Sequence, residues 1–189
     1  MTSYVPPLAD IRFVLDRVAR LDKVTGLPGL EHATPDLTEA ILEAAGQLAA
    51  EVLAPLNATG DRQGSVLENG VVRTPEGFRE AYRRFVEGGW NGLVFPERWG
   101  GQGLPTLVST AVLEMWKSSN LAFSLCQMLT LGAVEAIAHH GSDALKHRFL
   151  EPMVEGRWTG TMNLTEPQAG SDLAALRSRA VPEGDHYRV

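Results

Sequence analysis

The sequence is short of cysteine and of clustered positive charge. Its only cysteine is Cys126, so no disulfide can form within the chain. Leu125, Met128 and Leu129 lie nearby, so we expect Cys126 to be a small buried core residue and not a catalytic thiol. The 23 acidic residues outnumber the 17 basic ones, giving a formal net charge of -6. No block of Lys or Arg is dense enough to follow a phosphate backbone, so we expect no nucleic-acid partner.

Signals for export and membrane insertion are also lacking. Asp10 and Arg12 interrupt the apolar residues near the N-terminus before a signal peptide could form, so we expect a cytoplasmic protein. The longest apolar segment, residues 121–138, approaches membrane-spanning length but contains Gln127 and Glu135. It also lacks flanking aromatic and basic belts. We therefore expect no membrane span, and predict a helix buried in the middle of a bundle.

What the sequence does have is helical periodicity. The 189 residues are 44% hydrophobic and 21% charged, which suits a globular chain with a substantial core. Pro55 should weaken the end of the second helix, with a loop over 57–64. Asn120 and Ser142 are placed to cap helices. The apolar spacing predicts helices near 8–21, 37–56, 75–87, 106–117, 121–138 and 143–152.

A glycine-rich loop and a group of histidines each suggest a ligand site, but local structure accounts better for both. The loop 90–104 precedes a helix, where phosphate could bind, but no Gly-Lys-Ser/Thr follows, so we expect a structural loop. His139, His140 and His147 lie near Glu135, but their spacing matches no established metal motif. Histidines are also favoured in a last helical turn by the helix dipole. We expect no metal site.

From Trp158 the pattern changes from helical to extended. We expect β structure from that residue, a strand over 178–181, a turn at 182–185 and a returning strand at 186–189. Such a change of period predicts a second domain.

The segment 161–172 is dense in hydrogen-bond donors. Pro167 keeps Glu166 extended, while Gly170 permits a positive φ, so that successive N–H groups could converge on one point. Ser171 adds a hydroxyl. Neutral donors of this kind suit a phosphate or a carbonyl-rich heterocycle. Pro, Gly, Ser and Asp also make ordinary surface turns, and turn chemistry alone favours such a turn.

Residues 164–172, Leu-Thr-Glu-Pro-Gln-Ala-Gly-Ser-Asp, resemble the Thr-Glu-Pro-Gly-Ala-Gly-Ser-Asp flavin-binding signature of acyl-CoA dehydrogenases. Gln168 replaces a common Gly, and Met162 stands where many members have an aromatic residue. Loop 90–104 is similar to the family's G-x-x-x-P-E-x-x-G-G-x-G connection. Residues 4–15 resemble an extra N-terminal segment of a branch that includes methylmercaptopropionyl-CoA dehydrogenases and broad-range fatty acyl-CoA enzymes.

The resemblance implies a mainly α fold, in which an N-terminal helical bundle precedes the truncated start of a β domain. The expected divisions are an extension helix at 1–34, the helical domain at 35–156 and the first β strands at 157–189. It also implies FAD, an acyl-CoA substrate, an electron-transfer flavoprotein as partner, and a homodimer or higher oligomer. The family's catalytic glutamate would lie beyond Val189, so no residue here is expected to be catalytic.

Site residues follow from the resemblance one at a time. Cofactor contacts are expected from Met162, Leu164, Thr165, Gly170 and Ser171. Substrate contacts are expected from Ser171, Leu125 and Met128, although core packing alone would also account for the last two. Glu166 is expected to be structural. The alternative function is a non-catalytic helical interaction module with a short β docking edge.

Overall fold

The computed structural model describes residues 4–189, so residues 1–3 of the expected extension lie outside it. The regular elements are, in chain order, α1 Leu8–Phe13, a π-helical turn Val14–Val18, α2 Leu21–Thr25, α3 Pro35–Leu48, a π-helical turn Ala49–Leu53, α4 Ala54–Gln63, β1 Val66–Glu68, β2 Val71–Arg73, α5 Phe78–Glu87, α6 Thr106–Ser119, α7 Leu121–His140, α8 Asp143–Val154, β3 Val181–Glu183 and β4 His186–Arg188. Short 3-10 turns lie at Trp90–Gly92, Glu97–Trp99 and Leu173–Ala175. The predicted fold, mainly α with a helical bundle followed by short β structure, is confirmed.

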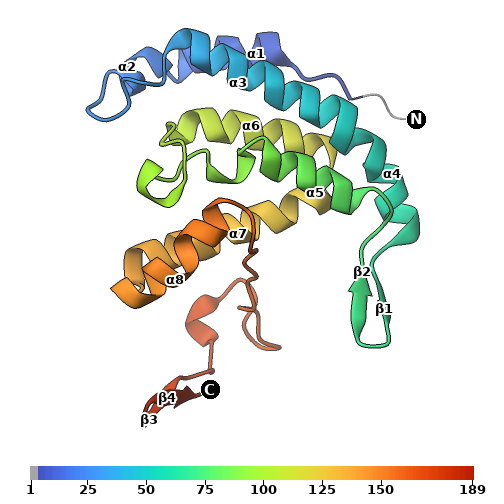
Figure 1. Ribbon diagram of the computed structural model, residues 1–189, viewed down its shortest axis with the longest axis vertical. Coiled ribbons are helices and arrows are strands. Elements are labelled where there is room, and N and C mark those ends of the chain that lie inside the picture. Colours follow the sequence, from blue (N-terminus) through green and yellow to red (C-terminus); the bar gives the residue numbers. More distant parts are fainter. Residues whose placement is uncertain (1–3) are drawn as a thin grey trace.

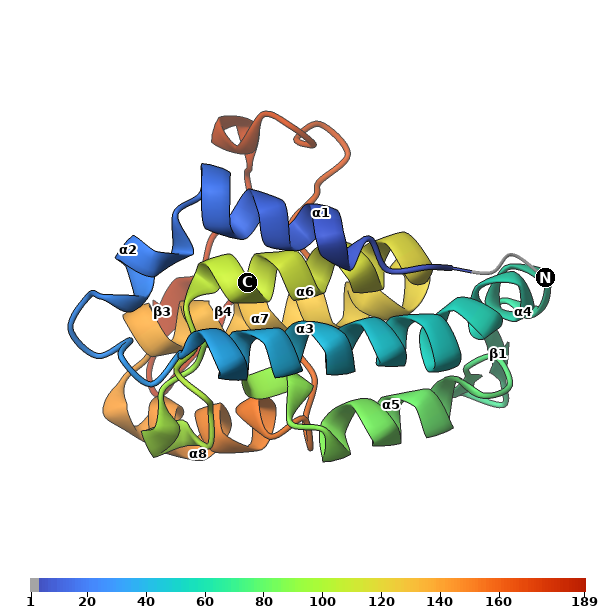
Figure 2. The ribbon, with the colours of Figure 1, turned by 90° about the horizontal axis from the view of Figure 1, so that it is seen from above.

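The helices form layers (Figure 1). In that view α1, α2 and α3 cover α5 and α6, and α7 and α8 lie on the opposite side of α6. Seen from above, α1 and α3 run along α6 (Figure 2). The core is aromatic where the layers meet, since the Phe85 ring lies 5.0 Å from the Trp116 ring and 5.8 Å from the Phe123 ring. This packing holds α5, α6 and α7 together.

The N-terminal segment is not the single helix that the spacing predicted. A π-helical turn follows α1, and Arg20 has a positive φ of 55° before α2. The wider turn leaves Val14 and Val18 exposed, although the periodicity had placed both on the apolar face. Ile11 and Leu15 are buried as expected.

The predicted loop at 57–64 is wrong, because α4 extends from Ala54 to Gln63. A π-helical turn over Ala49–Leu53 leads directly into α4, in whose first turn Pro55 lies, so this proline stands where the helical hydrogen-bond pattern changes.

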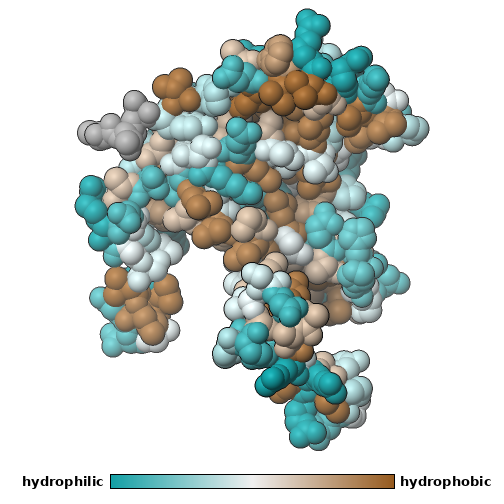
Figure 3. All heavy atoms as spheres, turned by 180° about the vertical axis from the view of Figure 1, so that it is seen from behind, coloured by the Kyte–Doolittle hydropathy of each residue, from teal (hydrophilic) through white to brown (hydrophobic). Residues whose placement is uncertain are grey.

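The β1–β2 hairpin was not predicted. Asn69 and Gly70 have positive φ values of 52° and 78°, as the favoured two-residue hairpin turn requires. Leu67 pairs with Val72 in the hairpin, and both side chains are exposed. The hairpin stands away from the helical body with apolar side chains gathered on it (Figure 3).

Loop 90–104 folds on itself, in agreement with a structural role. The amide of Gln102 donates to the Gly92 carbonyl at 2.9 Å, and the amide of Leu104 donates to the Leu93 carbonyl at 2.8 Å. A Cβ on Gly101 would lie 2.0 Å from the Phe95 carbonyl oxygen, so only glycine fits there.

Helix α5 begins at Phe78, three residues later than the predicted Pro75 start. Gly77, with a positive φ of 85°, forms its N-cap. The helix therefore starts where the backbone leaves that left-handed conformation.

Helix α7 differs from its prediction in burial. Asn120 caps it as expected, accepting from the Phe123 amide at 3.0 Å. However, α6 is the more buried helix, and α7 exposes 55% of Leu121 and 43% of Leu125. Cys126 is exposed too, so the expectation of a buried core cysteine is wrong. Leu121 and Leu125 are therefore largely open to solvent within residues 4–189.

By length and composition α7 could cross a membrane, and it is the one described helix that could. A single helix of this kind does not by itself indicate a membrane span, since core helices of soluble proteins have the same length and composition.

Helix α8 begins as predicted, because the Ser142 hydroxyl accepts from the Leu145 amide at 3.4 Å. It ends at Val154 and not at Pro152, which lies inside its last turn. The predicted C-terminal hairpin is confirmed. Its first strand begins at Val181 and not at residue 178, and its turn consists of Gly184 and Asp185, two residues fewer than predicted. No regular strand spans 158–165.

Candidate functional site

The chain leaves the helical bundle over residues 158–160, where two hydrogen bonds hold it to α7 and α8. The Gly160 amide donates to the Thr130 hydroxyl at 3.1 Å, and Thr130 in turn donates to the Cys126 carbonyl at 2.8 Å. The Trp158 amide donates to the Pro152 carbonyl at 3.0 Å. A Cβ on Gly160 would lie 2.5 Å from the Ala133 methyl, so the backbone approaches α7 too closely for any side chain. Helices α7 and α8 thus fix where the next segment begins.

Residues 161–189, which we term the C-terminal arm, extend away from the bundle (Figure 1). Met162 and Leu164 are exposed by 54% and 41%. The Met162 methyl lies 3.6 Å from the position that a Cβ on Gly132 would take, which places this side chain against α7. Thr165 and Ser171 are exposed, and neither hydroxyl makes a hydrogen bond within residues 4–189.

The turn in the C-terminal arm does not use Gly170 as expected. Glu166 and Ala169 exchange two backbone hydrogen bonds of 3.1 and 3.0 Å, which close the turn one residue before Gly170. Gly170 has no positive φ, and a Cβ there would meet nothing within 4 Å. The predicted convergence of N–H groups through a left-handed glycine is absent from this part of the described chain.

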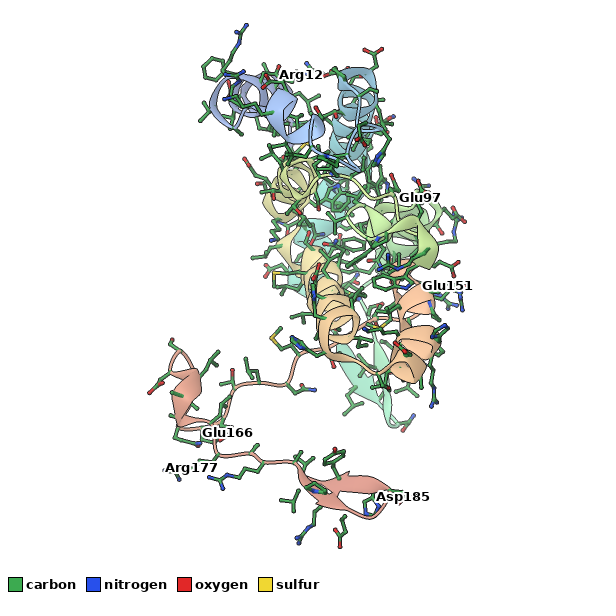
Figure 4. The ribbon with its side chains drawn as sticks, turned by 90° about the vertical axis from the view of Figure 1, so that its left-hand side faces the viewer. Arg12, Glu97, Glu151, Glu166, Arg177 and Asp185 are labelled. Carbon is green, nitrogen blue, oxygen red and sulfur yellow. The ribbon has the colours of Figure 1, made fainter. Side chains whose placement is uncertain are left out.

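Glu166 has the structural role that the sequence suggested. Its carboxylate accepts from the backbone amides of Arg177 and Ser178, each at 2.9 Å, and Figure 4 shows Glu166 beside Arg177. Hydrogen bonds lower the pKa of Glu166 to about 2. The bonds from Ser178 have the largest effect, and those from the Arg177 amide and the Gln168 side chain add to it. A carboxylate held charged by donors is a weak base.

The expected substrate residues lie on the exposed face of α7. Leu125 and Met128 are 43% and 38% exposed on one side of this helix, the same helix that Met162 touches through Gly132. Ser124 is buried, and its hydroxyl donates to the Asn120 carbonyl. Gly160, which lies against α7, thus leads along the chain into the exposed turn 164–172, which carries the Thr165 and Ser171 hydroxyls.

The histidines do not gather into a metal site. His139 contacts Glu135 at 3.1 Å, whereas His147 contacts the Asp143 carbonyl at 2.7 Å. Within residues 4–189 no group of three or more His, Cys, Asp or Glu side chains is arranged to hold a metal ion.

One cavity was missed by the sequence reasoning. It has a volume of about 540 Å³, lies between α4, α5 and α7, and is mainly apolar, with Phe78, Tyr82, Phe123 and Cys126 among its lining residues. None of the expected site residues lines it. Helical spacing could have identified its aromatic residues only as core, because spacing does not show how α4, α5 and α7 are placed around the cavity.

Comparison with known proteins gives a consistent match. Residues 35–157 match the family described as acyl-CoA dehydrogenase, N-terminal domain. The chain is 44% identical over 183 residues to 3-methylmercaptopropionyl-CoA dehydrogenase from Ruegeria pomeroyi, covering 97% of this chain and 31% of that protein. It is 32% identical to a butyryl-CoA dehydrogenase from Syntrophomonas wolfei, covering 95% of this chain and 30% of that protein. The chain thus spans about a third of the length of these relatives.

A solved structure has the same fold. Butyryl-CoA dehydrogenase from Megasphaera elsdenii superposes with a TM-score of 0.63 at 25% sequence identity, covering 78% of this chain and 37% of that one.

Proposed function

Because the chain belongs to the acyl-CoA dehydrogenase family, we propose that it is the N-terminal part of an FAD-dependent enzyme that oxidises an acyl-CoA thioester to the trans-2-enoyl-CoA. The observation that supports this most is the exposed turn at 164–172, whose Thr165 and Ser171 hydroxyls make no hydrogen bond within residues 4–189.

The residues present fit one side of a flavin site. Thr165 and Ser171 offer hydroxyl donors that nothing else in the described chain uses, and the space around Gly170 is open. These are neutral donors, which suit the carbonyl-rich flavin edge and a pyrophosphate. Met162 and Leu164 offer exposed apolar side chains for the ring.

We assign roles accordingly. Met162, Leu164 and Thr165 would lie against the isoalloxazine, with Thr165 as a hydrogen-bond donor to its pyrimidine edge. Gly170 and Ser171 would hold the pyrophosphate, and Ser171 would also contact CoA. Leu125 and Met128 would lie along the acyl chain, because both are exposed on the apolar face of α7.

The reaction divides between cofactor and protein. FAD, when bound, would supply the acceptor for a hydride from the substrate β-carbon, and an electron-transfer flavoprotein would be the electron acceptor for the enzyme. A base must also take the α-proton, and Glu166 is unsuited to this because its carboxylate is already bonded to the amides of Arg177 and Ser178. We propose that the base lies outside this chain, in a cytoplasmic enzyme that assembles as a homodimer or larger oligomer.

The experiment compares the 189-residue chain with the full-length enzyme to which we assign it. Each is mixed with FAD, desalted and examined for flavin absorbance, then assayed for acceptor reduction with a series of acyl-CoAs. The full-length enzyme should retain flavin and turn over, whereas the chain alone should retain little FAD and show no turnover, since it lacks the base. A full-length protein that neither retains flavin nor turns over would support the interaction module instead. Turnover by the chain alone would mean that its base had been overlooked.

A further inference from the structure

One side chain closes the loop of the C-terminal arm that carries the cofactor residues. The Glu166 carboxylate accepts from the Arg177 amide through Oε2 and from the Ser178 amide through Oε1, each at 2.9 Å. These partners lie 11 and 12 residues further along the chain. Both ends of the loop 166–178 are therefore joined at a single carboxylate.

Gln168 adds a second tie inside the same loop. Its Nε2 donates to Glu166 Oε2 and to the Ala175 carbonyl, the latter at 3.3 Å. The common flavin-binding signature has Gly at this position, and a glycine has no side chain that could donate to either acceptor. The tie is therefore a property of this chain that the general signature does not have.

Packing alone cannot hold the loop closed. Between residues 161 and 189 only Ala169 is buried, and the rest of the loop is exposed or half-buried. With so little apolar surface removed from water, the loop depends on its hydrogen bonds to remain ordered. Charge-assisted bonds to a carboxylate are the stronger kind.

We propose that Glu166 and Gln168 form a clamp that keeps the loop 166–178 closed, and that they act as positioning residues for the cofactor contacts of Thr165, Gly170 and Ser171. The cofactor part of this inference rests on the proposed function. Thr165 adjoins Glu166, and the other two residues lie within the closed loop. An open loop would have to be ordered by the ligand at binding, which weakens affinity without altering the chemistry.

The first test measures the clamp without any cofactor. Amide hydrogen exchange of Arg177 and Ser178 is followed in the 189-residue chain and in its Glu166→Gln variant. An amide side chain offers one acceptor oxygen without charge, so exchange of these two amides should rise about tenfold, as expected for losing one hydrogen bond to a charged group. Glu183→Gln is the matched control, because this exposed carboxylate lies on the same arm and contacts only exposed Arg188. Unchanged exchange in Glu166→Gln would overturn the clamp.

The second test uses the full-length enzyme and its FAD dissociation constant. Gln168→Met keeps the length of the side chain without its donors, and should weaken FAD binding about tenfold while kcat at saturating FAD stays unchanged. Gln168→Lys restores a donor and should recover most of the affinity. A Met variant that binds FAD as tightly as wild type would overturn the cofactor role. A wild-type enzyme that binds no FAD would instead refute the proposed function, while the exchange result would still decide whether the clamp exists.

Discussion

The hydrogen bond between Gly160 and Thr130 should decide how firmly the C-terminal arm is attached to the bundle. Thr130→Val keeps the shape of the side chain but removes the hydroxyl that accepts from the Gly160 amide at 3.1 Å. Thr130 is 1% exposed, so water cannot readily replace its hydroxyl. Leaving a donor unsatisfied in such a place costs about 1–3 kcal/mol.

A matched control exists in α6. The Thr110 hydroxyl donates to the Thr106 carbonyl at 2.8 Å, just as Thr130 donates to the carbonyl four residues before it, but Thr110 is exposed and accepts from no other segment. Thr110→Val should therefore change stability by less than about 0.5 kcal/mol. The contrast isolates the bond to Gly160 from any effect of valine within a helix.

Two measurements on the 189-residue chain separate the outcomes. Exchange of the Gly160 amide should rise about fivefold or more in Thr130→Val, and urea unfolding should show a lower free energy of unfolding. Thr110→Val should leave both quantities near the wild-type values. If the two valine variants show the same Gly160 exchange rate and the same free energy of unfolding, the bond between Gly160 and Thr130 does not hold the arm to the bundle.

Two further predictions concern the cap of α7 and the titration of the arm. Asn120→Ala removes the cap of α7 and leaves the Leu53 carbonyl without its 3.0 Å partner, so unfolding free energy should fall by about 2–4 kcal/mol in urea titrations, against about 0.5–1 kcal/mol for the exposed cap change Ser142→Ala. Equal losses would contradict the buried role of Asn120. Because the folded pKa of Glu166 is lowered from 4.5 to about 2, its contribution to stability is fully present above pH 4.5 and is lost as the pH falls toward 2. Carboxyl NMR titration should show that low pKa, and an ordinary value would contradict the hydrogen bonds to the loop.

Helix existence was predictable because the apolar spacing and the caps act locally. Asn120 and Ser142 each accept from the backbone amide three residues on, as cap residues do, and the sequence alone indicated both. Pro55 misled the prediction, because a π-helical turn before it let the helix continue. The missed β1–β2 hairpin had a signal in Asn69-Gly70, the dipeptide most typical of a tight hairpin turn.

Burial was harder to predict than helicity. Hydropathy describes the residues of α7 but not what covers them, and Leu121, Leu125 and Cys126 turned out to be exposed. The structural role of Glu166 was predicted from its place in the turn. Its partners at Arg177 and Ser178 were not, because a hydrogen bond across 11 or 12 residues leaves no periodic pattern in the sequence.

If residues 164–172 hold FAD in an acyl-CoA dehydrogenase, removing their hydroxyl donors should lower the flavin content of the full-length enzyme. Thr165→Ala and Ser171→Ala, together with the controls His139→Ala and His147→Ala, are purified, mixed with FAD, desalted and measured for flavin per protein. Each lost donor should weaken FAD binding by about 1–3 kcal/mol, so the first two variants should lose flavin on desalting while the histidine variants keep the wild-type amount. Full flavin content in both the Thr165 and Ser171 variants would contradict this role of residues 164–172.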